Sequence, residues 1–123
     1  MNIVETVPSD IPLLEDFTWG LPVQASIWAG EPWMPDEFKL GGKVLISKRQ
    51  TGVNGDSVWQ FYKTQMQGGG WVLTTPAPAS GANYFNVTFT KGERKAILWF
   101  YGGKGHTASP VLPQGYRLEI LYK

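Results

Sequence analysis

The single histidine of this sequence is the first side chain to consider for chemistry. His106 lies in the glycine-rich run 102–106, Gly-Gly-Lys-Gly-His, which directly follows an apolar stretch. One imidazole cannot form a multi-histidine metal site, and the apolar segments carry no carboxylates at ligand spacing. The run also lacks the Ser or Thr that follows the lysine of a phosphate-binding loop, and Pro110 and Pro113 exclude the helix that such a loop precedes. We therefore interpret it as a connecting loop, and we expect neither a metal nor another cofactor.

The acidic and hydroxyl side chains give little support for catalysis. The adjacent carboxylates Glu15-Asp16 and Asp36-Glu37 lie in a proline-rich region, where neighbouring side chains point apart. A glycoside hydrolase needs two acids that converge across a cleft, which adjacent positions do not provide. Ser57 lacks the glycine context of a nucleophile elbow. The chain is accordingly predicted not to be an enzyme.

Aromatic and basic side chains are the remaining candidates for a functional surface. The chain has six Trp, six Phe and five Tyr residues. Such rings stack on sugar rings or nucleic-acid bases, but the RNP1 pattern is absent and a net charge of +1 does not favour strong phosphate binding. The predicted contact surface combines the aromatic residues that the core does not need with basic residues on nearby turns: Trp19, Trp28, Trp33, Trp99, Lys91, Arg94, Lys95 and Lys104.

The charges are divided along the chain. Residues 1–42 carry seven acidic side chains and one basic side chain, whereas residues 43–123 carry ten basic and three acidic ones. The two parts should attract each other. One hypothesis is that the acidic part packs on the basic part as ordinary surface, and the alternative is that a basic face stays exposed for an anionic ligand.

The size and composition predict one domain. A chain of 123 residues can bury a core of its own, and the absence of cysteine excludes disulfide scaffolds and zinc ribbons. We expect residues 1–123 to form a single domain in which a Pro- and Trp-rich acidic segment, residues 1–42, packs on a helix-and-sheet core, residues 43–123. The longest uninterrupted apolar run, residues 96–101, is far shorter than a membrane span requires.

One amphipathic helix is predicted after the turn at residues 51–55. Ser57 and Gln60 have the spacing of a capping box. The apolar positions that follow recur at helical spacing, and Gly68-Gly69-Gly70 ends the helix. The stripe consists of Val58, Phe61, Tyr62 and Met66.

Short β-branched and alternating runs predict the strands. They cover residues 23–29, 43–49, 71–75, 84–90, 95–101 and 116–123. The short turns between them favour an α+β fold, a mainly antiparallel sheet with the amphipathic helix packed on one face. The strand at 95–101 is apolar on both faces, so its second face should also be buried against other apolar groups. The N-terminal segment is the nearest candidate, and a homodimer partner or a ligand is the alternative.

A set of short motifs resembles a known pattern. The motifs are Val58-x-x-Phe61-Tyr62, then Gly70-Trp71, then Phe89-x-Lys91-Gly92-x-Arg94, with a closing β-strand. They resemble small uncharacterised bacterial α+β domains of the kind often found in secreted or lipid-anchored proteins, and the resemblance covers roughly residues 43–123. It implies an extracytoplasmic accessory or binding domain, periplasmic or at the cell surface, and supplies no catalytic residues. The sequence as given begins without a signal peptide, so a cytoplasmic location is the alternative.

These observations lead to one functional hypothesis and two alternatives. The main hypothesis is a non-catalytic interaction or binding domain of a bacterial extracytoplasmic protein, with a protein or envelope component as partner. The first alternative is binding of a carbohydrate or other small ligand through exposed Trp residues. The second is binding of single-stranded nucleic acid.

Overall fold

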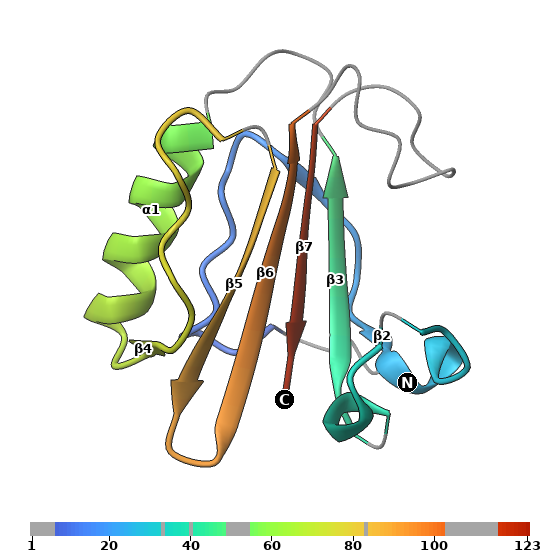
Figure 1. The fold of residues 1–123 in the computed structure, drawn as a ribbon. Coiled ribbons are helices and arrows are strands. Elements are labelled where there is room, and N and C mark those ends of the chain that lie inside the picture. The colour runs from blue at the N-terminus through green and yellow to red at the C-terminus, as the bar shows by residue number, and fades with distance from the viewer. Residues whose placement is uncertain (1–6, 33, 40, 49–54, 83, 103–115) are drawn as a thin grey trace.

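The computed structural model describes residues 7–32, 34–39, 41–48, 55–82, 84–102 and 116–123, and it confirms the predicted α+β class. One α-helix and two short 3-10 helices accompany a seven-stranded sheet in these ranges, with every described pair of neighbouring strands antiparallel (Figure 1). The elements in chain order are β1 (Thr18–Trp19), β2 (Val23–Gln24), η1 (Ala25–Trp28), η2 (Asp36–Phe38), β3 (Lys43–Lys48), α1 (Gly55–Gly68), β4 (Val72–Leu73), β5 (Tyr84–Lys91), β6 (Arg94–Gly102) and β7 (Tyr116–Tyr122).

The sheet places strands from both ends of the chain side by side. Its order is β1-β3-β7-β6-β5-β4, and β2 also pairs with β3. Strands β5 and β6 form a hairpin whose turn contains Gly92 with φ of 61°, a value that glycine adopts without strain. The pairing of β3 with β7 joins segments about 70 residues apart, and a buried hydroxyl extends it: Ser47 Oγ donates to the Leu118 carbonyl at 2.9 Å and accepts from the Leu118 amide at 3.3 Å.

The helix begins earlier than predicted. Because α1 starts at Gly55, Ser57 lies inside its first turn with an exposed side chain, and the predicted capping box is wrong. The turn at residues 79–82 positions this end of the helix instead. The Gly81 amide donates to Asp56 Oδ1 at 2.9 Å, and a Cβ at Gly55 would lie only 2.1 Å from the carbonyl oxygen of Ala82.

The helix stripe packs on one face of the sheet, which we call the first face. Val58, Tyr62 and Met66 are buried as predicted, Phe61 is half-buried, and Trp59 is buried in addition. Inward side chains of the strands complete the cluster, which also includes Ile11 and Phe17 of the N-terminal segment: Leu45, Trp71, Phe85, Val87, Phe89, Ala96, Leu98, Phe100, Leu118, Ile120 and Tyr122.

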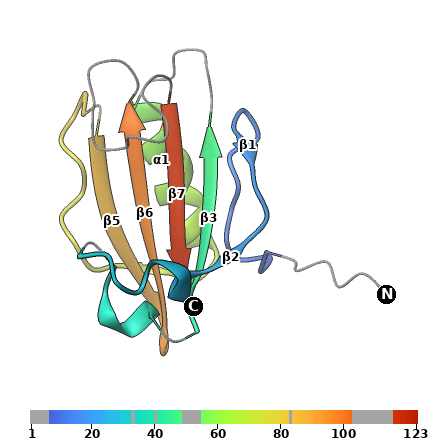
Figure 2. The same cartoon turned by 90° about the vertical axis from the view of Figure 1, so that its right-hand side faces the viewer.

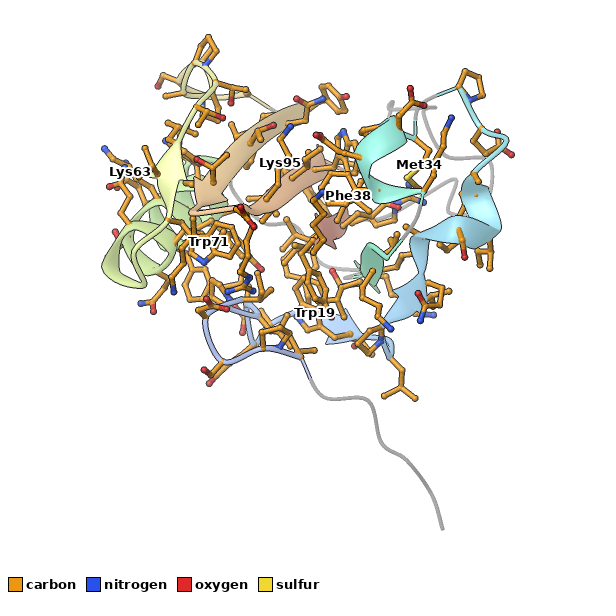
Figure 3. The ribbon with its side chains drawn as sticks, turned by 90° about the horizontal axis from the view of Figure 1, so that it is seen from below. Trp19, Met34, Phe38, Lys63, Trp71 and Lys95 are labelled. Carbon is orange, nitrogen blue, oxygen red and sulfur yellow. The ribbon has the colours of Figure 1, made fainter. Side chains whose placement is uncertain are left out.

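The opposite, second face of the sheet is covered at one end by the described residues of the segment 25–38. Figure 2 shows this segment crossing the lower end of the strands while α1 lies behind them. It contributes Ala25, Met34 and Phe38 to a second buried cluster, which the sheet completes with Val44, Ile97 and Leu121. Figure 3 shows Met34 and Phe38 on the opposite side of the sheet from Trp71. The apolar second face of β6 is therefore packed against the chain itself at this end.

Two expected strands differ from the structure. The strand predicted at 23–29 is wrong beyond Gln24, because the chain turns into η1 after the Ala25 amide donates to the Gly42 carbonyl at 2.9 Å. The strand predicted at 71–75 is reduced to β4, although the Thr74 amide still donates to the Thr88 carbonyl at 2.9 Å. The other predicted strands match β3, β5, β6 and β7 closely.

Candidate functional site

The predicted contact residues are divided between the two faces of the sheet. Trp19 packs against the first cluster, and its indole N–H donates to the Leu14 carbonyl at 2.9 Å. Trp28 and Trp99 pack, half-buried, against the second cluster. The structure thus brings Trp28 and Trp99 to one face and separates them from Trp19.

Several sequence predictions lie outside the described residues. They include two of the predicted contact residues, the histidine loop and most of the turn before the helix: Trp33, Lys104, the run 103–106 with His106, and residues 51–54.

Two of the predicted basic residues bind one carboxylate of the N-terminal segment. Lys91 Nζ lies 2.8 Å from Asp10 Oδ2, and Arg94 binds both oxygens of the same carboxylate, with Nη2 3.2 Å from Oδ1. The Arg94 guanidinium also lies over the Trp71 ring, 4.9 Å from its centroid, while the Trp71 indole donates to the Asp10 carbonyl at 2.9 Å. The hydrogen bond from Arg94, together with that from Lys91, lowers the pKa of Asp10 below its ordinary value, against a smaller opposing effect of burial.

A second carboxylate of the N-terminal segment, that of Glu37, binds the third of these basic residues, Lys95. Lys95 Nζ donates to Glu37 Oε1, and Lys123 Nζ donates to the Glu37 carbonyl at 3.3 Å. Lys123 also lies over the Phe38 ring, 5.9 Å from its centroid. Lys91, Arg94 and Lys95 therefore all bind acidic side chains from residues 1–42.

A different group of side chains shares the end of the second face that residues 25–38 leave uncovered. In Figure 2 no other described segment crosses this face above residues 25–38. The strand registers align two rows of side chains there, Tyr84–Tyr101–Arg117 and Asn86–Trp99–Glu119. We call the six residues of these rows the upper sheet patch.

The first row consists of planar groups in contact with one another. The rings of Tyr84 and Tyr101 have centroids 5.3 Å apart and planes inclined at 55°. The Arg117 guanidinium lies over the other side of this row, 4.7 Å from the centroid of the Tyr101 ring. Tyr84 is the most exposed aromatic member, with 44% of its surface accessible. Burial raises the pKa of Tyr101 above its ordinary value.

The charged members of the patch form an ion pair along β7. Arg117 Nη2 lies 2.7 Å from Glu119 Oε2, and only 12% and 14% of the two side chains are exposed. Burial raises the pKa of Glu119, and the positive charge of Arg117 acts against that rise. A pair held this tightly presents donors and acceptors in fixed positions.

Sequence reasoning found only Trp99 of this patch. The alternation of residues 84–90 and 116–123 does place Tyr84, Asn86, Arg117 and Glu119 away from the first core. The missing information was the adjacency of β5, β6 and β7 and the end of their second face on which the segment 25–38 packs, neither of which follows from alternation.

One open depression lies elsewhere, between the N-terminal segment and the end of α1. It has a volume of about 460 Å³ and is lined mostly by small and polar residues: Ser9, Asp10, Pro12, Thr64, Gln65, Gly68 and Gly69. Among the described residues that line it, Asp10 is the one charged group, and Lys91 and Arg94 already bind its carboxylate.

Comparison with known proteins gives one match. A family model described as START domain-like matches residues 48–99, which include α1, β4, β5 and most of β6. No curated protein and no solved structure matches the chain. Of the helices in the described ranges, none has the length and hydrophobicity needed to cross a membrane.

Proposed function

We propose that this protein is a non-catalytic binding domain that holds its ligand on the upper sheet patch. The observation that supports the proposal is that, within the part of the chain that the structure describes, the segment 25–38 covers one end of the second face. The other end carries aromatic, amide and charged side chains on adjacent strands. Aromatic rings beside a few fixed polar groups are typical of binding sites.

The packing of the first face favours the second face as the site. Among the described residues, seventeen buried side chains from α1, the sheet and the N-terminal segment form one cluster on this face. Native cores of this kind are close-packed and leave little room for a ligand. A ligand would therefore meet the sheet from the side opposite α1.

The ion pairs argue against the nucleic-acid alternative. Lys91, Arg94 and Lys95 are bound to Asp10 and Glu37, so a phosphate would have to displace carboxylates to reach them.

The location of the protein is a further part of the proposal. We place the domain in a bacterial extracytoplasmic protein whose partner is a protein or envelope component, because residues 43–123 resemble domains of such proteins. Cell fractionation of the full-length gene product tests this placement.

The binding proposal is tested with an array of oligosaccharides, peptides and single-stranded DNA. We compare the wild type with a Tyr84→Ala/Asn86→Ala double variant and with Val72→Ala. Val72 is also exposed, at 60%, and lies at the far edge of the sheet on β4. At least one ligand should lose binding to the double variant and keep binding to Val72→Ala. If no ligand of any class depends on the patch, the proposal fails.

A further inference from the structure

We propose that Lys91, Arg94 and Trp71 form a binding site for the carboxylate of a small organic acid, and that Asp10 occupies this site from within the same chain. The proposal goes beyond the binding function of the upper sheet patch and does not depend on it. It is carried by three observations: the donors that converge on the carboxylate, the groups that hold those donors in place, and the space beside them.

Three nitrogen atoms of two side chains converge on one carboxylate. Lys91 Nζ lies 2.8 Å from Asp10 Oδ2, and the Arg94 guanidinium donates to both oxygens, with Nη1 on Oδ2 and Nη2 3.2 Å from Oδ1. A planar guanidinium that binds both oxygens matches a carboxylate in shape as well as in charge. Two positive side chains face one negative side chain here, so the donors suit an anion rather than a neutral group.

Groups outside the N-terminal segment hold the two basic side chains in place. The Arg94 guanidinium lies over the buried Trp71 ring, 4.9 Å from its centroid, and its Nε donates to the Lys123 carbonyl at 3.3 Å. The stem of Lys91 lies against Gly70, where a Cβ would be only 3.3 Å from Lys91 Cε. The donors should therefore keep their positions when the carboxylate is absent, which is the property of a preorganised site.

The space beside the donors fits a small ligand. Asp10 is among the residues that line the open depression of about 460 Å³ between the N-terminal segment and the end of α1. The next residue, Ile11, is buried in the first cluster and anchors the backbone on this side. Only the Asp10 side chain has to move to free the donors. The room that it leaves, next to the depression, suits a ligand of a few atoms better than a second peptide segment.

The same arrangement makes the site self-inhibited in the wild type. A group tethered beside its binding site has an effective concentration of about millimolar or more. A free acid must displace the Asp10 carboxylate to reach Lys91 and Arg94, so it competes poorly with it. Removal of this carboxylate should open the site.

Chemical rescue of Asp10→Ala with acetate tests the proposal. We compare urea denaturation of the full chain in sodium acetate and in sodium chloride at equal ionic strength. Acetate should raise the folding equilibrium constant of Asp10→Ala about twofold at a concentration equal to its dissociation constant, and about tenfold at ten times that concentration. The wild type should show no such gain over chloride, because Asp10 fills the site.

Two variants and a peptide serve as controls. Asp10→Ala/Arg94→Lys keeps the positive charge but lacks the two-pronged guanidinium, so it should lose most of the gain in acetate. Asp36→Ala removes an exposed carboxylate that pairs with Lys39 and should show no gain. A synthetic peptide of residues 7–14 should rescue Asp10→Ala no better than acetate does.

The remaining outcomes are decisive. Equal stability of Asp10→Ala in acetate and chloride overturns the proposal and leaves the contacts of Asp10 as structural ion pairs. A gain that Asp10→Ala/Arg94→Lys retains in full overturns the assignment to this site, and rescue by the peptide without rescue by acetate overturns the small acid as ligand. If Asp10→Ala does not fold in chloride, recovery of folded protein in acetate supports the proposal, and failure in both salts overturns it.

Discussion

Asp10 is the residue that ties the N-terminal segment to the β5–β6 hairpin. Its carboxylate binds Lys91 and Arg94, and its carbonyl oxygen accepts from the Trp71 indole. Only 17% of the side chain is exposed, so water screens these contacts less than it screens a surface ion pair. A single carboxylate at this position stabilises a contact between residues more than 80 positions apart.

Replacement of this carboxylate should destabilise the fold. Asp10→Asn leaves Lys91 and Arg94 without their shared negative partner, and we expect the free energy of unfolding to fall by about 1.5 to 3 kcal/mol. Urea denaturation measures the change. Asp36→Asn is the control, because the Asp36 side chain is 95% exposed where it pairs with Lys39, so water screens that ion pair and its loss should change the stability much less. Equal effects of the two substitutions would contradict this role of Asp10.

The same carboxylate should give a defined pH dependence. The pKa of Asp10 is lower in the folded protein than in the unfolded chain, so its stabilising contribution is present above the unfolded pKa, about 3.9, and is lost as pH falls through the folded pKa. The stability difference between the wild type and Asp10→Asn should therefore be constant near neutral pH and shrink in acid. Urea denaturation at a series of pH values measures it. A difference that persists unchanged at the acid end would show that the charge of Asp10 is not its source.

At the scale of the elements, strand β3 is the one that holds both ends of the chain in one sheet. It pairs with β7 on one side and with β1 and β2 on the other. The backbone register of β3 with β7 ends at Ile46 and Glu119, and the Ser47 hydroxyl makes the next contact by binding both backbone groups of Leu118. The hydroxyl thereby satisfies buried polar groups at the place where β3 turns toward β1.

Removal of that hydroxyl should be costly. Ser47→Ala leaves the Leu118 amide and carbonyl without this partner in a buried site, and we expect a loss of about 1 to 3 kcal/mol in the free energy of unfolding. Ser57→Ala makes the same chemical change at an exposed helix position and should be neutral or slightly stabilising. Chemical denaturation of both variants compares them. A neutral Ser47→Ala would contradict the bridging role.

The two ends of α1 should respond oppositely to one substitution. Gly55→Ala places a Cβ against the Ala82 carbonyl oxygen, so the backbone must shift, and we expect a loss of at least about 1 to 3 kcal/mol. Gly68→Ala has no atom within 4 Å of the new Cβ and should stabilise the protein by up to about 1 kcal/mol. Thermal unfolding monitored by circular dichroism measures both. A stable Gly55→Ala variant would show that the turn at 79–82 does not position the helix.

At the scale of the whole molecule, different segments of the chain cover the two faces of the sheet. The first face is sealed by α1 and by Ile11 and Phe17 of the N-terminal segment. Within the described residues, the segment 25–38 covers the second face at one end, and the upper sheet patch at the other end is the surface for which we propose a binding function.

The cover over the second face should be a cooperative part of the fold. Phe38 is fully buried against the sheet, so Phe38→Ala should lower the free energy of unfolding by about 3 to 5 kcal/mol in one transition. Denaturation followed by both far-UV circular dichroism and tryptophan fluorescence measures it. Two separated transitions would show that residues 25–38 pack independently of the sheet.

Local sequence patterns predicted which helices and strands form better than they predicted which of these elements lie next to one another. The helix stripe and the strands at 84–90, 95–101 and 116–123 follow from side-chain periodicity, because period and burial are linked within one element. The predicted capping box was wrong because α1 begins at Gly55, where it contacts Gly81 and Ala82, residues distant in sequence. The strand predicted at 23–29 was wrong beyond Gln24 because the chain turns into η1 directly after the Ala25 amide donates to the Gly42 carbonyl.

The candidate site could be predicted only in part, because it too depends on contacts between segments that are distant in sequence. Strand alternation placed Arg117 and Glu119 on the outer face, and the apolar character of both faces of 95–101 correctly indicated a second cover. The partners of Lys91 and Arg94 and the row that joins Tyr84 to Arg117 depend on which strands and segments become neighbours.

The sequence by itself determined the α+β class, one amphipathic helix, most of the strands and the opposition of an acidic N-terminal part to a basic remainder. These properties arise from residue types and from periods that act within a few positions along the chain. Only the tertiary structure decided which tryptophans pack against the cores, which acids bind the basic side chains, and which six residues form the upper sheet patch. Such choices depend on contacts between distant segments, whose partners are selected by the packing of the whole chain.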